Sequence, residues 1–238
     1  MCLQQNLNVR HTRLAFTPAE TLMLSLAVFV ASIFALQADT VVVIGMAERD
    51  LTGDGQPEVL KLVGDGRSVD SLDVTFSIES AGATVYRARL FPMTRMVGFG
   101  RSRRRLSRAQ YREQRAEFGK WFFGPTKFKR PPDFVKTWGG QASGRLAQVP
   151  RVIARDRKFS TTVDSLVALG HSPIEAERTA QSVVRPVSAA DSIRAVATWK
   201  EIQESGVTIF EYSAGGDHVT AIGWSARDRR FYRLVECC

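Results

Sequence analysis

The sequence from Val74 to Leu90 reads VTFSIESAGATVYRARL. Apolar and polar residues alternate on both sides of the Ser80–Ala83 segment, which is the period-2 pattern of half-buried strands. A short segment that contains Gly82 and joins two such runs is typical of a hairpin turn. The stretch therefore predicts an antiparallel β-hairpin.

Strand patterns also lie on either side of this hairpin and again at the end of the chain. We expect strands within residues 41–92, a helical region over 106–204 and a three-stranded antiparallel meander within 207–236. Strands, then helices, then strands indicate an α+β domain rather than alternating βαβ units. The predicted fold is an antiparallel sheet built from the N- and C-terminal strand blocks, with a central helical insertion.

Helix boundaries in the central region follow from capping patterns. Ser107 with Gln110 and Ser172 with Glu175 form capping boxes. We expect two short helices over 162–184, joined at Gly170–Pro173, and a further helix over 188–204. Loops are expected where prolines and paired glycines interrupt the pattern, at Pro125, Pro131, Pro132, Gly139 and Gly140.

The first 38 residues have the pattern of a secretory signal peptide. Arg10 and Arg13 precede an unbroken apolar run from Leu22 to Leu36, and Ala38 fits the last position before a cleavage site. The alternative is an uncleaved signal anchor, although the run is shorter than a comfortable membrane span. We therefore expect one exported α+β domain, 39–238, that is periplasmic or secreted, or else tethered by a single-pass anchor.

Composition and charge narrow the function classes. The 238-residue chain is 44% hydrophobic and has 33 Lys+Arg against 24 Asp+Glu, a net charge of +9. This composition excludes a wholly disordered chain, a collagen-like fibre and a polytopic membrane protein. Outside the cytoplasm, the basic surplus favours an anionic surface polymer or a lipid head group over nucleic acid as a partner. The candidate polyanion-binding residues are Arg101, Arg103, Arg104, Arg105, Arg108, Lys127, Lys129 and Arg130.

The acidic segment 50–58 has the spacing of a calcium loop. Oxygen ligands at alternating positions can converge on one cation where glycines let the backbone curl. The candidate ligands are Asp50, Thr52, Asp54, Glu58 and the main-chain carbonyl of Gln56. The alternative is a glycine-rich hairpin whose aspartates bond to their own backbone.

The same segment resembles the calcium loop of FG-GAP/VCBS-type repeats, which lies between two strands. The resemblance covers residues 41–65 in a single copy, with Thr52 and Glu58 replacing the usual residues. It implies a structural calcium ion and does not extend to the propeller fold.

Residues 162–184 resemble a second family, the UBA-like C-terminal domain of the bacterial Holliday-junction subunit RuvA. The resemblance rests on Leu169-Gly170-His171 followed by Glu175-Ala176, with His171 where an aromatic residue is usual. It implies a protein partner for the helical pair.

Catalytic signals are sparse. No GxSxG, HExxH or CxxC pattern occurs, and Cys237-Cys238 form an adjacent terminal pair. We therefore expect an exported bacterial protein that is a non-catalytic binding or assembly module with a structural calcium loop. The alternatives are an extracytoplasmic hydrolase that uses His218 as its base, and a basic module that binds an anionic surface polymer or lipid head group.

Overall fold

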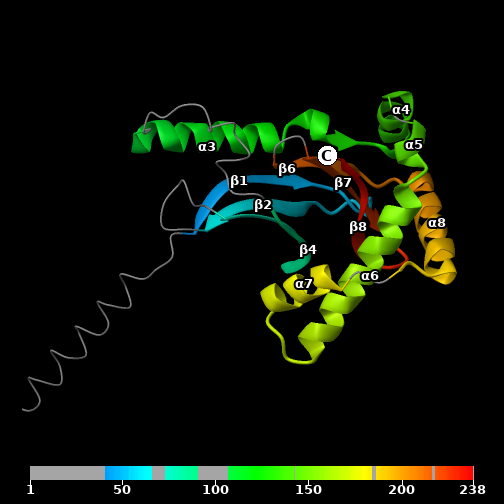
Figure 1. Ribbon diagram of the computed structural model, residues 1–238. Helices are drawn as coiled ribbons and strands as arrows, with labels where there is room; N and C mark the ends of the chain where they lie inside the picture. The colour runs from blue at the N-terminus through cyan, green and yellow to red at the C-terminus, as the bar shows by residue number, and fades with distance from the viewer. Residues whose placement is uncertain are drawn as a thin grey trace, which may run out of the picture. The chain divides into compact units, whose positions relative to one another are not determined.

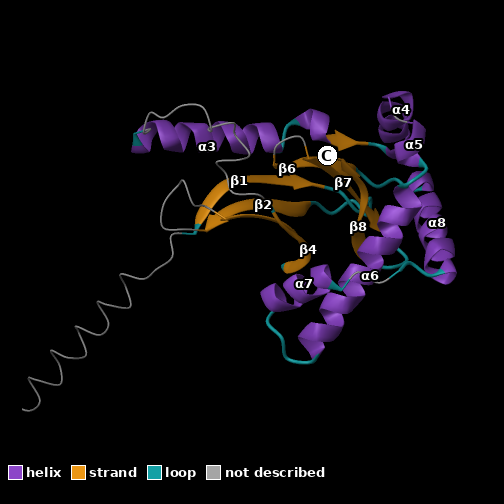
Figure 2. Ribbon diagram, viewed as in Figure 1, coloured by secondary structure: helices purple, strands orange, loops and turns teal. Residues whose placement is uncertain are grey.

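Two antiparallel sheets and a set of helices make up the described part of the chain (Figure 1 and Figure 2). The computed structural model describes residues 41–65, 73–90, 107–141, 143–183, 186–215 and 218–237. The expected signal peptide, residues 1–38, lies outside the described residues. Within the described residues, no helix combines the length and apolarity needed to cross a membrane.

The N-terminal strand block forms a four-stranded sheet in the described residues, here called sheet A. Its strands follow one another in chain order, each antiparallel to the next. The predicted hairpin is confirmed, and its turn residues Ala81 and Gly82 have positive φ angles of 49° and 79°. The strands are β1 (Val42–Arg49), β2 (Glu58–Asp65), β3 (Asp73–Ser80) and β4 (Ala83–Arg89).

The helical region follows sheet A. Ser107, Ser172 and Ser188 each cap a helix through a complete capping box, which confirms the two boxes predicted from the sequence. The helices are α3 (Arg108–Phe122), η3 (Pro125–Lys127), α4 (Pro131–Gln141), α5 (Ser143–Leu146), α6 (Val149–Ala168), α7 (Pro173–Ser182) and α8 (Ala189–Glu204).

Two expectations about this region are wrong. Residues 131–141 form a helix rather than a loop, because prolines are tolerated in the first helical turn. The expected short helix that begins at residue 162 is the C-terminal end of the 20-residue helix α6. The apolar residues Val149, Ile153 and Ala154 are buried in the first part of α6, and the helix therefore begins well before residue 162.

The C-terminal meander is confirmed and forms sheet B. Strands β6 (Ile209–Gly215), β7 (His218–Ser225) and β8 (Arg230–Cys237) pair in chain order, and β5 (Phe128–Lys129) adds to β6. The α+β fold class is confirmed. The two strand blocks form separate sheets rather than one joint sheet, because each strand pairs with its neighbours within its own block.

An aromatic core joins the two sheets. The Phe76 ring of sheet A lies 5.4 Å from the Phe210 ring and 5.1 Å from the Tyr212 ring of sheet B. Phe122 of α3 also packs into this core. A second core packs Phe134, Ile153 and Trp199 of α4, α6 and α8 against sheet B. Sheet B therefore lies between sheet A and the helices α4, α6 and α8.

Candidate ligand-binding cleft

A cleft of about 490 Å³ lies where β4, the helices α6 and α7, and the strands β7 and β8 meet. Small-molecule and cofactor sites in proteins are concave and of comparable volume. Its lining comes from segments that are distant in sequence, so only the folded chain forms it.

Strand β4 lines the cleft with its edge. Six consecutive residues, from Val85 to Leu90, contribute to the lining. Since side chains alternate between the faces of a strand, a lining of consecutive residues means that the edge of the backbone faces the cleft. In the described residues β4 is one of the two edge strands of sheet A and pairs with β3 alone.

Helix α6 presents one face to the cleft. Its lining residues are Asp156, Phe159, Ser160, Val163 and Asp164, the spacing of one helical face. Helix α7 adds Glu177 and Gln181, one turn apart. The long α6 thus fixes five side chains in one row beside the edge of β4.

An ion-pair chain crosses from α6 to β8 in the cleft wall. Asp156, which is 6% exposed, accepts hydrogen bonds from the Arg233 main-chain N–H at 3.0 Å and from Arg233 Nε at 2.5 Å. Arg233 also donates to Glu236 at 2.5 Å. Burial opposes the charge on Arg233, but Asp156 and Glu236 outweigh it and raise the pKa of the guanidinium. The wall is therefore charged and fixed in position.

Two tyrosine hydroxyls meet at the cleft between the sheets. The Tyr86 and Tyr212 hydroxyl oxygens lie 2.9 Å apart. Burial raises the pKa of Tyr212 to about 12 and raises the pKa of Tyr86 well above its ordinary value. Both side chains are therefore neutral near pH 7 and join sheet A to sheet B by a hydrogen bond.

His218, the predicted base of the hydrolase alternative, lies at the start of β7 and lines the cleft. Ser225 lies at the other end of the same strand, roughly 23 Å away at the rise of an extended chain. Ser225 is therefore too far away to be the nucleophile for His218. Ser213 is nearer, because it pairs with Val219 on the neighbouring strand.

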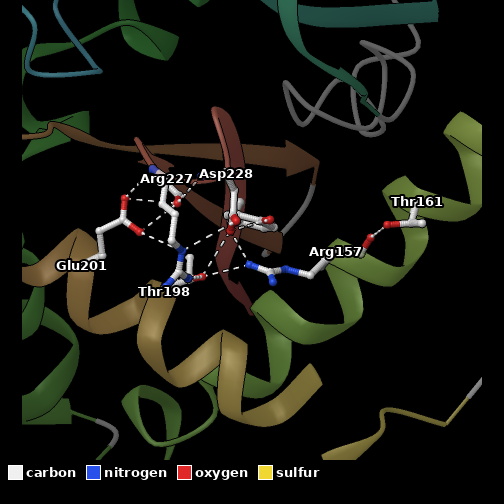
Figure 3. A network of polar contacts seen from close by, with 8 residues as sticks. Arg157, Thr161, Thr198, Glu201, Arg227 and Asp228 are labelled. Carbon is white, nitrogen blue, oxygen red and sulfur yellow. Dashed lines mark hydrogen bonds and ion pairs between the residues drawn. The ribbon is translucent and has the colours of Figure 1, made fainter. Parts of the chain in front are cut away.

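A separate polar network holds the turn between β7 and β8 (Figure 3). Arg157 of α6 donates to Asp228 in the turn and, at 3.0 Å, to Thr198 of α8. Asp228 also accepts from Tyr232 at 3.0 Å.

Glu201 extends this turn network along α8. It accepts hydrogen bonds from the fully buried Ser225 hydroxyl and from the Arg227 main-chain N–H, both at 3.0 Å. The Glu201 carboxylate is therefore satisfied by groups of the chain itself, whereas the buried Nε of Arg157 has no hydrogen-bond partner among the described residues.

The acidic loop 50–58 forms a tight turn between β1 and β2. Gly53 and Gly55 have φ angles of 78° and 85°, so the backbone curls as the glycines allow. Asp50 accepts from the N–H groups of Gly53 at 2.7 Å and Gly55 at 3.0 Å, and Asp54 accepts from Gln56 at 2.8 Å. The aspartates therefore bond to their own backbone.

Glu58 turns inward from this loop. It is fully buried, and it accepts from the Leu51 N–H at 2.7 Å and the Thr52 hydroxyl at 3.1 Å. Across the described residues, no three His, Cys, Asp or Glu side chains gather in a group that could hold a metal ion. The geometry of the loop favours the self-bonded hairpin, and calcium binding stays a prediction.

The structure describes the side chains of three of the candidate polyanion-binding residues, Lys127, Lys129 and Arg130. Arg101, Arg103, Arg104 and Arg105 lie outside the described residues, as does the side chain of Arg108. Lys127 lies over the Trp121 ring at 4.5 Å, Lys129 pairs with Glu211 at 2.7 Å, and Arg130 donates to the Gly206 carbonyl. The last three basic residues are thus held by contacts within the chain.

The predicted helical pair corresponds to the end of α6 and α7. Gly170, with φ of 93°, ends α6, and the His171 N–H donates to the Leu166 carbonyl as in a Schellman motif.

Searches of protein-family models, curated proteins and solved structures each find no match to this chain. The FG-GAP/VCBS and UBA-like resemblances therefore stay predictions from short motifs.

The cleft was not predicted from the sequence. Asp156 and Arg233 are separated by 77 positions, and Tyr86 and Tyr212 by 126. The one available signal is the spacing of Asp156, Phe159, Ser160, Val163 and Asp164, which mixes polar and apolar residues on one helical face.

Proposed function

We propose that this chain is an exported, non-catalytic binding module and that the cleft between β4, α6, α7, β7 and β8 is its ligand site. The observation that carries the proposal is a cleft of about 490 Å³ whose walls are joined by hydrogen bonds and ion pairs. Walls fixed in this way lose little conformational entropy when a ligand binds.

The order of the walls supports a binding role. The Tyr86–Tyr212 pair fixes β4 relative to sheet B, and the Asp156–Arg233 pair fixes α6 relative to β8. The turn network holds α6 and α8 against the β7–β8 turn. The binding surface is thus preformed in the absence of ligand.

The proposal is tested by substituting a large side chain on α6 that would occupy the cleft. Ser160→Trp places a large ring at a lining position, and the matched control Thr161→Trp changes the next residue, which is exposed and does not line the cleft. The wild type and both variants are titrated with soluble sugars, short peptides, fatty acids and nucleotides.

We expect at least one of these classes to bind the wild type and Thr161→Trp but not Ser160→Trp. Equal binding by Ser160→Trp, or no binding by any class, would contradict the proposal. Matching melting curves for the two tryptophan variants establish that a difference in binding is not a difference in folding.

Export is the second part of the proposal, and the residues that support it are Arg10, Arg13, the apolar run Leu22–Leu36 and Ala38. Intact mass of the protein from bacterial cells that express the full chain tests it. We expect a product that begins at Asp39. A full-length product in the membrane fraction would support the uncleaved anchor, and a full-length product in the cytoplasm would contradict export.

A hydrolase that uses His218 as its base is the second candidate, because His218 lines the same cleft. A nucleophile and its base must come within about 2.6–3.2 Å of each other. Hydrolysis of chromogenic esters by the wild type, abolished in His218→Asn and retained in Ser225→Ala, would favour this candidate over the binding module.

A further inference from the structure

We infer that the ligand of the cleft is an extended polypeptide segment that adds as a further strand to the edge of β4, which is unpaired among the described residues, and carries an acidic side chain opposite Arg87. This inference rests on the proposed function and names the class of its ligand. The outer edge of a sheet can bind a peptide strand through main-chain hydrogen bonds.

The register of the hairpin identifies the groups that face the cleft. The Leu90 N–H donates to the Val74 carbonyl at 2.7 Å, and Ala88 lies opposite Phe76 two residues away. Hydrogen-bonded pairs alternate along an antiparallel ladder, so the main-chain groups of Leu90 and Ala88 point toward β3. The N–H and C=O groups of Arg87 and Arg89 therefore point away from β3, toward the cleft.

Charge on the outer face of sheet A gives the chemistry of the partner strand. Lys61 pairs with Glu79 on β3 at 2.6 Å, and Arg89 pairs with Asp73 at 2.6 Å. Arg87 lies opposite Ser77, and no carboxylate of the described residues forms an ion pair with it. An added strand would supply the acidic side chain on the open side of Arg87, because opposite charges on neighbouring strands attract.

The remaining charges of the cleft disfavour a polyanion. Arg230 and Arg233 are balanced by Asp164, Asp156 and Glu236. Glu177 adds a further negative charge from α7. A ligand that carries one acidic group on an otherwise uncharged backbone therefore suits the cleft better than a polyphosphate or nucleic acid does.

The test uses the full chain and an array of heptapeptides with glutamate or lysine fixed at the centre and other positions varied. The best peptide is remade with N-methyl groups on alternate amides. We expect the glutamate series to bind better, and one of the two N-methyl patterns to abolish binding while the other retains it.

Two substitutions at one residue separate the main chain from the side chain. Arg87→Ala removes the charge and keeps the N–H, so we expect affinity to fall about 2- to 5-fold. Arg87→Pro removes the N–H as well, at an edge position where no ladder bond within sheet A is lost, so we expect a fall of about 10-fold or more. Equal effects of the two substitutions would overturn the inference.

A second measurement serves if Arg87→Pro does not fold. In the wild type, peptide binding is expected to slow amide hydrogen exchange at Arg87 and Arg89, and unchanged exchange at both would overturn the inference. A dimer that Arg87→Pro converts to a monomer would assign the edge to a second copy of this chain. Binding of a sugar or fatty acid that Ser160→Trp blocks, with no peptide bound, would leave the proposed function standing and refute the peptide.

Discussion

Asp228 is the residue on which the turn network depends. Its carboxylate accepts from Arg157, Thr198 and Tyr232, and thereby joins α6, α8 and β8. The Arg157 side chain is 15% exposed, so it depends on Asp228 rather than on water for its charge balance. Most residues of the network lie far apart in the sequence, so no local sequence pattern predicts their contacts.

We predict that Asp228→Ala lowers the free energy of unfolding by about 1.5–3 kcal/mol, because a largely buried guanidinium loses its charged partner. Urea denaturation measures this change. The control is Asp164→Ala, which removes an exposed carboxylate 4.0 Å from Arg230 and should change stability by less than about 1 kcal/mol. Equal losses for the two variants would contradict the role given to Asp228.

The tyrosine pair gives a prediction about alkaline pH. Burial raises the pKa of Tyr212 to about 12, above its unfolded value of about 10. The stability that the neutral side chain contributes is therefore complete below about pH 10 and is lost as the pH rises through about 12.

We expect the difference in absorbance at 295 nm between the wild type and Tyr212→Phe to rise near pH 12. A rise near pH 10 in the folded protein would show that the Tyr212 hydroxyl is exposed and that the cleft wall is not closed.

Among the elements, α3 and β1 approach each other at two glycines. A Cβ atom at Gly119 would lie 2.5 Å from the Ile44 carbonyl oxygen, and one at Gly45 would lie 2.8 Å from the Gly119 Cα atom. Both neighbours are backbone atoms, so neither can move without displacing its element.

We predict that Gly119→Ala lowers the free energy of unfolding by about 1–3 kcal/mol, although alanine favours the helix itself. Gly144→Ala is the control, since its Cβ would meet nothing within 4 Å. Thermal melts of both variants test the contact. A neutral Gly119→Ala would mean that α3 does not pack closely on β1.

The loop 50–58 is interpreted either as a calcium site or as a hairpin whose carboxylates bond to their own backbone. A calcium ion bound only by the folded chain would raise the free energy of unfolding by about 2.7 kcal/mol at 100 times its dissociation constant. The calcium prediction expects this rise, whereas the self-bonded hairpin, in which Asp50, Asp54 and Glu58 accept hydrogen bonds within the loop, expects no change on adding calcium. A rise in melting temperature that Asp54→Ala abolishes would establish the calcium site instead.

The elements themselves could be predicted where their signals are local. Alternation gave the β3–β4 hairpin, and the capping boxes at Ser107 and Ser172 marked the starts of α3 and α7. The start of α6 was missed because residues 149–161 are rich in arginine and the buried positions are few. The loop predicted at Pro131 and Pro132 is wrong because both prolines lie in the first turn of α4. That helix is held by the packing of Phe134, which the sequence does not reveal.

At the scale of the whole molecule, sheet B lies between two different cores. One of its faces contacts the aromatic core shared with sheet A, and the other contacts the apolar faces of α4, α6 and α8. The cleft lies beside β8, between β4 from one side of sheet B and α6 from the other side. Its existence depends on how the two sheets stack, which strand patterns alone do not determine.

Residue-resolved amide chemical shifts test the central claim most directly. On addition of a ligand that the wild type binds, we predict the largest changes at residues 85–90, 156–164 and 230–236, which surround the cleft. Changes confined to the exposed apolar face of α8 around Ile193 and Val196, or to the outer residues Val43 and Met46 of β1, would contradict the assignment of the cleft as the ligand site.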